Sequence, residues 1–134
     1  MKYLFILIIL FSTKAYSKSP EGKGLICAFG KKSNFYETYL FFEKKYISKY
    51  LFLKNDTYEV RKNEKRNYSI TKNFITMKPF LINKKSLKII DTEFNRVIGS
   101  CKVVNSHKKA IEFIYQLKDI YQNKIDKNTG RISI

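Results

Sequence analysis

The sequence predicts a small, mainly β domain, an antiparallel β-barrel or sandwich of about eight strands followed by a C-terminal α-helix. Short runs of aromatic and β-branched residues recur at intervals of about 8–12 residues between polar turns. In the last third the apolar residues change to a helical period. The chain has 134 residues, which is the size of one domain.

The first 17 residues have the three parts of a secretory signal peptide. Lys2 gives a positive start, residues 3–11 are an unbroken apolar run, and residues 15–17 (Ala-Tyr-Ser) place small residues at −3 and −1 of a cleavage site. The run is too short for a bilayer, which takes about 20 apolar residues. We expect export to the periplasm or the medium, with residues 18–134 as one mature domain and no transmembrane segment. The alternative is an uncleaved interfacial anchor.

The expected strands are residues 25–29, 35–43, 46–54, 57–61, 68–71, 74–77, 87–90 and 96–104. Polar turn clusters separate them, such as residues 30–34 after the first strand and residues 55–56 between the third and fourth. Pro79 is expected to stop the sixth strand, because proline cannot donate to a central ladder.

Two cysteines fall in the first and last expected strands. In an exported protein two thiols usually pair, so we predict a Cys27–Cys101 disulfide that closes a loop of about 75 residues and contributes about 4–5 kcal/mol on the chain-entropy model. Strand alternation places two sets of side chains on the apolar face: Leu25, Cys27 and Phe29, and Val97, Cys101 and Val103. The alternatives are a reactive thiol with His107 as its base, and unpaired or intermolecular cysteines.

Residues 106–123 have the spacing of an amphipathic helix, with Ser106 as its N-cap. The apolar stripe consists of Ala110, Ile111, Ile114, Leu117, Ile120 and Tyr121. We expect this helix to pack on the open end or the outer face of the sheet. A membrane-surface helix is the alternative, although Glu112 and Asp119 dilute its basic face. For the tail, residues 125–134, the sequence leaves two alternatives, a short strand or a frayed end.

The chain is strongly basic, with 27 Lys and Arg against 11 Asp and Glu. Loss of Lys2 and Lys14 with the leader leaves 25 basic residues and a net charge of +14 over 117 residues. Such a field favours anionic partners: nucleic acid, acidic polysaccharide or lipid headgroups. The candidate anion-binding residues are Lys31, Lys32, Lys62, Lys65, Arg66, Lys84 and Lys85. The alternative is solvated turns whose lysines follow AT-rich codon usage, because only 4 of the basic residues are Arg, the usual choice for phosphate.

Aromatic residues crowd into two neighbouring expected strands, residues 35–43 and 46–54. They are Phe35, Tyr36, Tyr39, Phe41, Phe42, Tyr46, Tyr50 and Phe52. With basic neighbours they could form a stacking platform for single-stranded nucleic acid. The simpler interpretation, which we favour, is that one face fills the core while outward rings pack on lysine stems.

Nothing in the sequence predicts an enzyme. One histidine and two cysteines cannot build the usual zinc or triad sites, and no phosphate loop, nucleophile elbow or His-Glu-x-x-His motif occurs. Asp91 and Glu93 lie two apart, but in a probable turn. A small hydrolase that joins His107 to a carboxylate and a hydroxyl is the enzymatic alternative. We expect a non-enzymatic interaction domain without cofactor or metal, which binds a ligand or an envelope protein through its loops or one mouth of the barrel.

Three features occur in a recognisable order: residues 24–27 (Gly-Leu-Ile-Cys) in the first strand, the aromatic strands, and residues 82–89 (INKKSLKI) ahead of Cys101. In this order residues 23–105 resemble small uncharacterised exported β-proteins of marine alphaproteobacteria and their phages. In those proteins an Asn-Arg-x-Thr-Leu-like segment precedes the closing cysteine strand, whereas Lys84 and Ser86 stand here at the Arg and Thr positions. The resemblance implies a barrel-like fold and export, and carries no activity.

Overall fold

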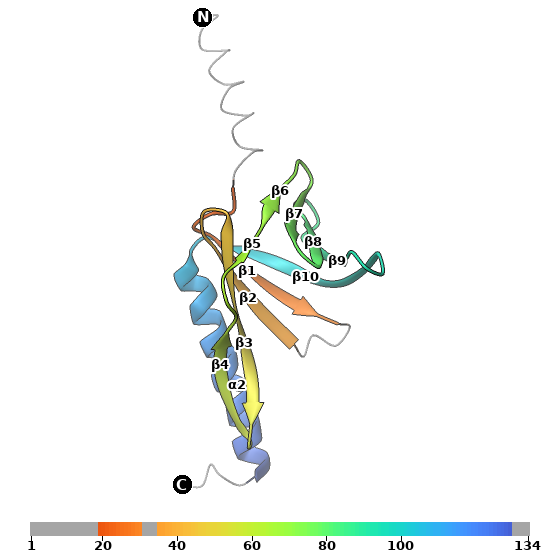
Figure 1. Cartoon of the computed structure of the whole chain (residues 1–134). Helices are drawn as coiled ribbons and strands as arrows, with labels where there is room; N and C mark the ends of the chain where they lie inside the picture. Colours follow the sequence, from red (N-terminus) through yellow and green to blue (C-terminus); the bar gives the residue numbers. More distant parts are fainter. Residues whose placement is uncertain (1–18, 31–34, 130–134) are drawn as a thin grey trace, which may run out of the picture.

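The computed structural model describes residues 19–30 and 35–129 (Figure 1). It contains one curled, half-barrel sheet of ten antiparallel strands, with an α-helix after the last strand. The elements are β1 (Gly24–Phe29), β2 (Phe35–Phe41), β3 (Lys45–Lys54), β4 (Thr57–Lys62), β5 (Arg66–Asn67), β6 (Ser69–Ile70), β7 (Phe74–Met77), β8 (Phe80–Asn83), β9 (Lys88–Asp91), β10 (Arg96–Val104) and α2 (His107–Thr129). The predicted fold class is confirmed.

Some expected features lie outside the described residues: the leader, Lys31 and Lys32, and the last five residues of the tail. Within the described part of the chain, no helix combines the length and the apolar character that crossing a membrane requires.

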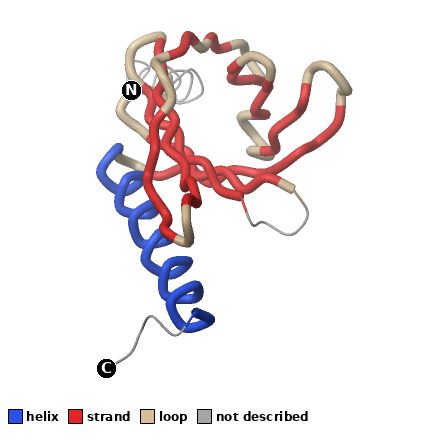
Figure 2. The backbone as a smooth tube through the Cα atoms, turned by 60° about the horizontal axis from the view of Figure 1, so that its bottom comes forward, coloured by secondary structure: helices blue, strands red, loops and turns tan. Residues whose placement is uncertain are grey.

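The strands follow the order β4-β3-β2-β1-β10-β9-β8-β7-β6, and this path curls back on itself (Figure 2). The short segment 66–70 pairs with strands on both sides of the curl. Its first half, β5, pairs with β3 through Tyr46 and Arg66, and its second half, β6, pairs with β7 through Ser69 and Thr76. One continuous segment therefore links strands from opposite sides of the curl.

The face inside the curl holds the core. Its buried side chains are Leu25, Cys27, Tyr39, Phe41, Tyr46, Tyr68, Ile75, Met77, Ile82 and Ile89. Phe29 packs against this cluster, so the predicted common face of Leu25, Cys27 and Phe29 is confirmed. The aromatic strands contribute to the core, as the simpler interpretation predicts, although Phe35 and Phe52 remain 47% and 37% exposed.

The predicted disulfide is present. Cys27 and Cys101 stand directly opposite each other on the neighbouring strands β1 and β10, with their Cα atoms 4.0 Å apart. The bond joins positions that are 74 residues apart in the chain. It therefore links the first and last strands of the chain, which are neighbours in the sheet, with Cys27 in the core and Cys101 packed against it.

One predicted face on β10 is wrong. Val97 is 57% exposed, whereas its neighbour Ile98 packs against the core. A register shift between Val97 and Gly99 against β9 marks a β-bulge, which reverses the alternation beyond it. Strict alternation counted back from Cys101 does not include this extra residue, so it assigns Val97 to the wrong face.

Helix α2 covers the outer face of β1 to β4, one of the two placements that the sequence predicts (Figures 1 and 2). Ala110 and Ile114 are fully buried there. Ser106 caps the helix, because its Oγ accepts a hydrogen bond from the Lys109 amide at 3.2 Å. His107, expected at the surface, is half-buried, and its Nε2 lies 2.7 Å from the Phe41 carbonyl oxygen.

The helix extends to Thr129, beyond the expected end at residue 123, so residues 125–129 are helical. Its second half lies against the β3–β4 hairpin. The Tyr58 amide donates to Gln122 Oε1 at 2.8 Å, and Gln122 Nε2 donates to the Asp56 carbonyl oxygen at 3.0 Å. Gln122 Nε2 also donates to Asp126 Oδ1 at 3.0 Å, a bond that reaches into the added turns.

Two strands, β5 and β8, have no counterpart in the sequence prediction. Pro79 ends β7 as expected, but it lies in the two-residue turn 78–79 that leads directly into β8. The Lys78–Pro79 peptide is cis. Pro79 thus lies in the turn of a hairpin, whereas only the end of a strand was expected there.

Candidate functional site

Three cavities adjoin one another at the opening of the curl where β1 and β9 begin. Ser19 lines the first two, and Lys84 lines the second and third. The core side chains fill the interior behind them.

The third cavity is lined by lysine and asparagine. It has a volume of about 710 Å³ and is bounded by Lys72, Asn73, Phe74, Asn83, Lys84 and Lys85. Lys72 and Asn73 come from the turn before β7, Lys84 and Lys85 come from the turn after β8, and Phe74 and Asn83 are the strand residues next to those turns. The antiparallel register places Phe74 opposite Asn83, so the two turns lie at the same end of one hairpin. We call this the lysine cavity.

Hydrogen bonds hold the two turns of the lysine cavity together. The Lys84 amide donates to the Asn73 carbonyl oxygen at 2.9 Å. Asn83 Oδ1 accepts from the amides of Lys85 at 2.8 Å and Ser86 at 3.0 Å, which is the side-chain-to-backbone pattern of an Asx turn. The backbones that carry Lys84 and Lys85 are thus fixed before any ligand arrives.

The charge of the lysine cavity is not neutralised locally. Within the described ranges, no carboxylate lies within 4.0 Å of the ammonium groups of Lys72, Lys84 or Lys85. Lys84 is half-buried, while the other two are exposed. Ammonium groups are compact point charges with three donors, suited to phosphate, sulfate or carboxylate oxygens. The cavity can therefore hold an anion.

The middle cavity is mainly apolar, with a volume of about 210 Å³. Its walls are Gly24, Leu25, Phe41, Ile75, Leu87 and Val103, and Ser19, Pro20, Lys23 and Lys84 complete the lining. We call this the apolar cavity. It opens beside the lysine cavity, with Lys84 between them.

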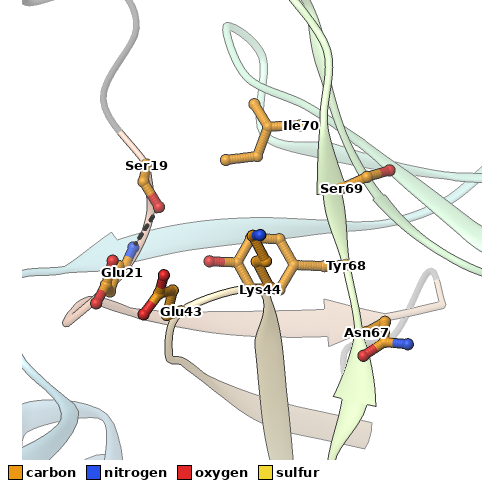
Figure 3. A pocket seen from close by; sticks show the side chains of 8 residues that line it. All are labelled: Ser19, Glu21, Glu43, Lys44, Asn67, Tyr68, Ser69 and Ile70. Atoms are coloured by element: carbon orange, nitrogen blue, oxygen red, sulfur yellow. Dashed lines mark hydrogen bonds between the residues drawn. The ribbon is translucent and has the colours of Figure 1, made fainter.

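The first cavity carries charges of both signs (Figure 3). It has a volume of about 670 Å³ and is lined by Ser19, Glu21, Glu43, Lys44, Asn67, Tyr68, Ser69 and Ile70. Figure 3 shows Glu21 and Glu43 on one side and Lys44 in front of the Tyr68 ring. Its two carboxylates make it a poorer site for an anion than the lysine cavity. No cluster of three potential metal ligands occurs among the described residues.

A polar cluster lies at the opposite end of the curl, around a cavity of about 50 Å³. The Tyr39 hydroxyl donates to Glu37 Oε2 at 2.6 Å, and Asn63 Nδ2 donates to Ser48 Oγ at 2.8 Å. Burial, and then the nearby Glu37 charge, raise the pKa of Tyr39 far above its usual range. The space suits a few water molecules, so this cluster acts in packing. Because side chains alternate along β2, Glu37 lies on the same inner face as Phe41. This pattern in the sequence could have indicated the polar cluster.

Burial also raises the pKa of Tyr46, while the positive charge of Arg66 opposes the rise. Arg66 therefore belongs to the polar cluster, although it was expected in an anion-binding patch. Its neighbour Lys65 lies 5.3 Å from the centroid of the Phe42 ring, and Lys62 ends β4. The expected patch of Lys62, Lys65 and Arg66 is thus divided among different surroundings.

Of the candidate anion-binding residues, only Lys84 and Lys85 are brought together in one described cavity. Lys72 completes that cavity, and sequence reasoning missed it. The acidic pair has a turn role, since the Glu93 amide donates to Asp91 Oδ1 at 2.8 Å. His107 serves the fold through its contact with the Phe41 carbonyl.

No protein-family model, curated protein or solved structure matches this chain. The resemblance of residues 23–105 to small exported β-proteins stays a prediction.

Proposed function

We propose that this protein is an exported, non-enzymatic binding domain, held together by one disulfide, that captures an anionic ligand in the lysine cavity. One observation carries the proposal. Lys72, Lys84 and Lys85 converge from two hydrogen-bonded turns, without a described carboxylate to neutralise them. A cluster of uncompensated cations on a fixed backbone attracts anions at long range and holds them at short range.

Export is supported by the leader sequence and by the disulfide, because cystines persist outside the reducing cytosol. Binding is supported by the chemistry of the lysine cavity, which offers charge and amide donors to a ligand. Its polar side chains are three lysines and two asparagines, which suit recognition of an anion.

The test is a titration of the mature protein with inorganic phosphate at low salt, followed by amide NMR. We expect shifts concentrated in residues 72–73 and 83–87. The triple variant K72Q/K84Q/K85Q should bind at least about tenfold more weakly, the loss of one or more charge-assisted hydrogen bonds. Raising the salt from about 50 to 200 mM should weaken binding by the wild type.

The matched control is K54Q/K124Q/K127Q, which removes the same charge from exposed positions at the far ends of β3 and α2. At about 150 mM salt, where charges more than about 8 Å apart are largely screened, it should bind phosphate within about twofold of the wild type. Equal weakening of both variants would show that the ligand senses only the overall charge. No binding by the wild type would end the proposal.

A further inference from the structure

We infer that the anion held by the lysine cavity is the headgroup of an amphiphile, whose apolar chain lies in the adjacent apolar cavity. This inference rests on the proposed function and adds the class of ligand. It starts from Lys84, which lines both cavities.

Lys84 is half-buried at the boundary of the two cavities. A headgroup beside its ammonium group has Lys72 and Lys85 on one side and the apolar walls on the other. Lys23 adds a second cation to the lining of the apolar cavity. Cations at the entrance of an apolar recess match a molecule with a negative head and an apolar tail.

The apolar cavity has the size for such a tail. Its volume of about 210 Å³ exceeds that of the engineered apolar cavities of about 150 Å³ that bind benzene. Val103, on its wall, is 42% exposed, although it lies two residues from the buried disulfide. An apolar side chain left partly open in a recess is a surface that a ligand can cover.

The wall and the headgroup site share one rigid turn. Leu87, on the wall, has a φ of 59°, which is a left-handed conformation that branched and bulky residues rarely adopt. Its amide donates to the Asn83 carbonyl oxygen at 2.8 Å, and its carbonyl accepts from the Cys101 amide at 2.7 Å. The same turn fixes Lys84 and Lys85. Such local strain is often found where a ligand site is preorganised.

Among anionic ligands, these observations favour a free amphiphile over a polymer. An acidic polysaccharide would leave the apolar cavity unused. Nucleic acid bases stack on successive exposed rings, whereas Phe41 has no exposed surface and the half-buried Phe74 is the one ring among the described residues that line the lysine cavity. A recess of this volume encloses one chain, so the ligand is a monomeric alkyl or acyl phosphate or carboxylate.

The test is calorimetry of the mature protein with inorganic phosphate and with butyl, hexyl and octyl phosphate, all below their micelle concentrations. Affinity should rise by about fourfold for each buried methylene until the cavity is full, and then level off. V103F should fill the apolar cavity and abolish this rise, while phosphate itself binds as before. V97F, on the same strand but in the lining of a different cavity, is the matched control and should keep the rise.

The outcomes separate the two proposals. Phosphate binding without dependence on chain length overturns the amphiphile and leaves the proposed function standing. No phosphate binding removes both. A rise that V103F leaves unchanged shows that the chain binds elsewhere and also overturns the inference. So does binding only to anionic vesicles, or only to a single-stranded oligonucleotide. Circular dichroism of V103F and V97F confirms that both variants fold.

Discussion

Gly24 of β1 lies directly beneath Ala110 of α2. A Cβ atom built on Gly24 would stand 2.6 Å from the Ala110 Cβ and 3.3 Å from the Tyr39 carbonyl oxygen. The helix therefore approaches the sheet as closely as it does because one residue has no side chain and the other has the smallest one.

We predict that Gly24→Ala destabilises the domain by about 1–3 kcal/mol, through overpacking against α2. Ala110→Gly alone should cost about 1 kcal/mol of helix propensity. The double variant should lose less than the sum of the two, because the second change makes room for the first. Urea unfolding of the four proteins measures this coupling, and strict additivity would contradict the contact.

Loss of the Cys27–Cys101 bond should lower the free energy of unfolding by about 4 kcal/mol, because the loop that it closes is long. Urea unfolding with and without reductant, and of the Cys27→Ala/Cys101→Ala variant, measures the loss. Intact-mass analysis of the exported protein should show a chain that begins at Lys18 with no free thiol. A reduced protein as stable as the oxidised one would refute the structural role of the bond.

The stability of the domain should fall above about pH 10. Tyr39 has a raised pKa in the folded protein, so the unfolded chain loses this proton first as the pH rises past the ordinary tyrosine value of about 10. The contribution of the neutral phenol is complete below that pH and decreases toward the folded pKa. Tyr46 and Tyr121 have raised pKa values and add to the trend.

Tyr39→Phe should reduce this alkaline slope and cost about 1–3 kcal/mol at neutral pH, because Glu37 loses its 2.6 Å donor. Urea unfolding across the pH range provides the measurement. Tyr115→Phe, at a 46% exposed position on α2, is the control and should leave both quantities unchanged. An unaltered alkaline slope in Tyr39→Phe would mean that other groups control it.

Gln122→Ala should release the β3–β4 hairpin from α2, since this side chain bonds both the Tyr58 amide and the Asp56 carbonyl. The expected loss is about 1–3 kcal/mol, with faster amide exchange at Tyr58. Gln116→Ala, at an exposed position on the same helix, is the matched control and should stay within about 0.5 kcal/mol of the wild type. Similar losses in both variants would point to helix propensity as the cause.

Much of the fold follows from local patterns. Alternation around Cys27 identified the core face of β1. Helical spacing correctly identified Ala110 and Ile114 as buried on α2, but Ile120, expected in the same stripe, is 51% exposed. Alternation gave the wrong face for Val97, because the β-bulge adds a residue to β10 that the alternating pattern of the sequence does not reveal. The end of α2 was also placed too early, because the apolar stripe used to predict it ends at Tyr121, whereas the helix continues to Thr129 and Gln122 bonds to Asp126.

Two of the three lysines of the lysine cavity could be predicted from the sequence. Lys84 and Lys85 are adjacent, so their charges form an obvious pair. Lys72 joins them only because Phe74 pairs with Asn83 across the β7–β8 hairpin. That hairpin was not predicted, since Pro79 was expected only to stop a strand and no strand was expected at residues 80–83. Proximity of residues twelve positions apart depends on strand register, which short-range patterns do not report.

The segment 66–70 holds β3 with two residue pairs and β7 with two more. Strand edges left unpaired are templates for association with other chains, and this segment occupies part of two of them at once. Tyr68 anchors the segment between its two halves, because its ring packs in the core and its hydroxyl donates to the Phe42 carbonyl oxygen at 2.6 Å. The same five residues therefore cover parts of two strand edges that would otherwise be open to pairing with another chain.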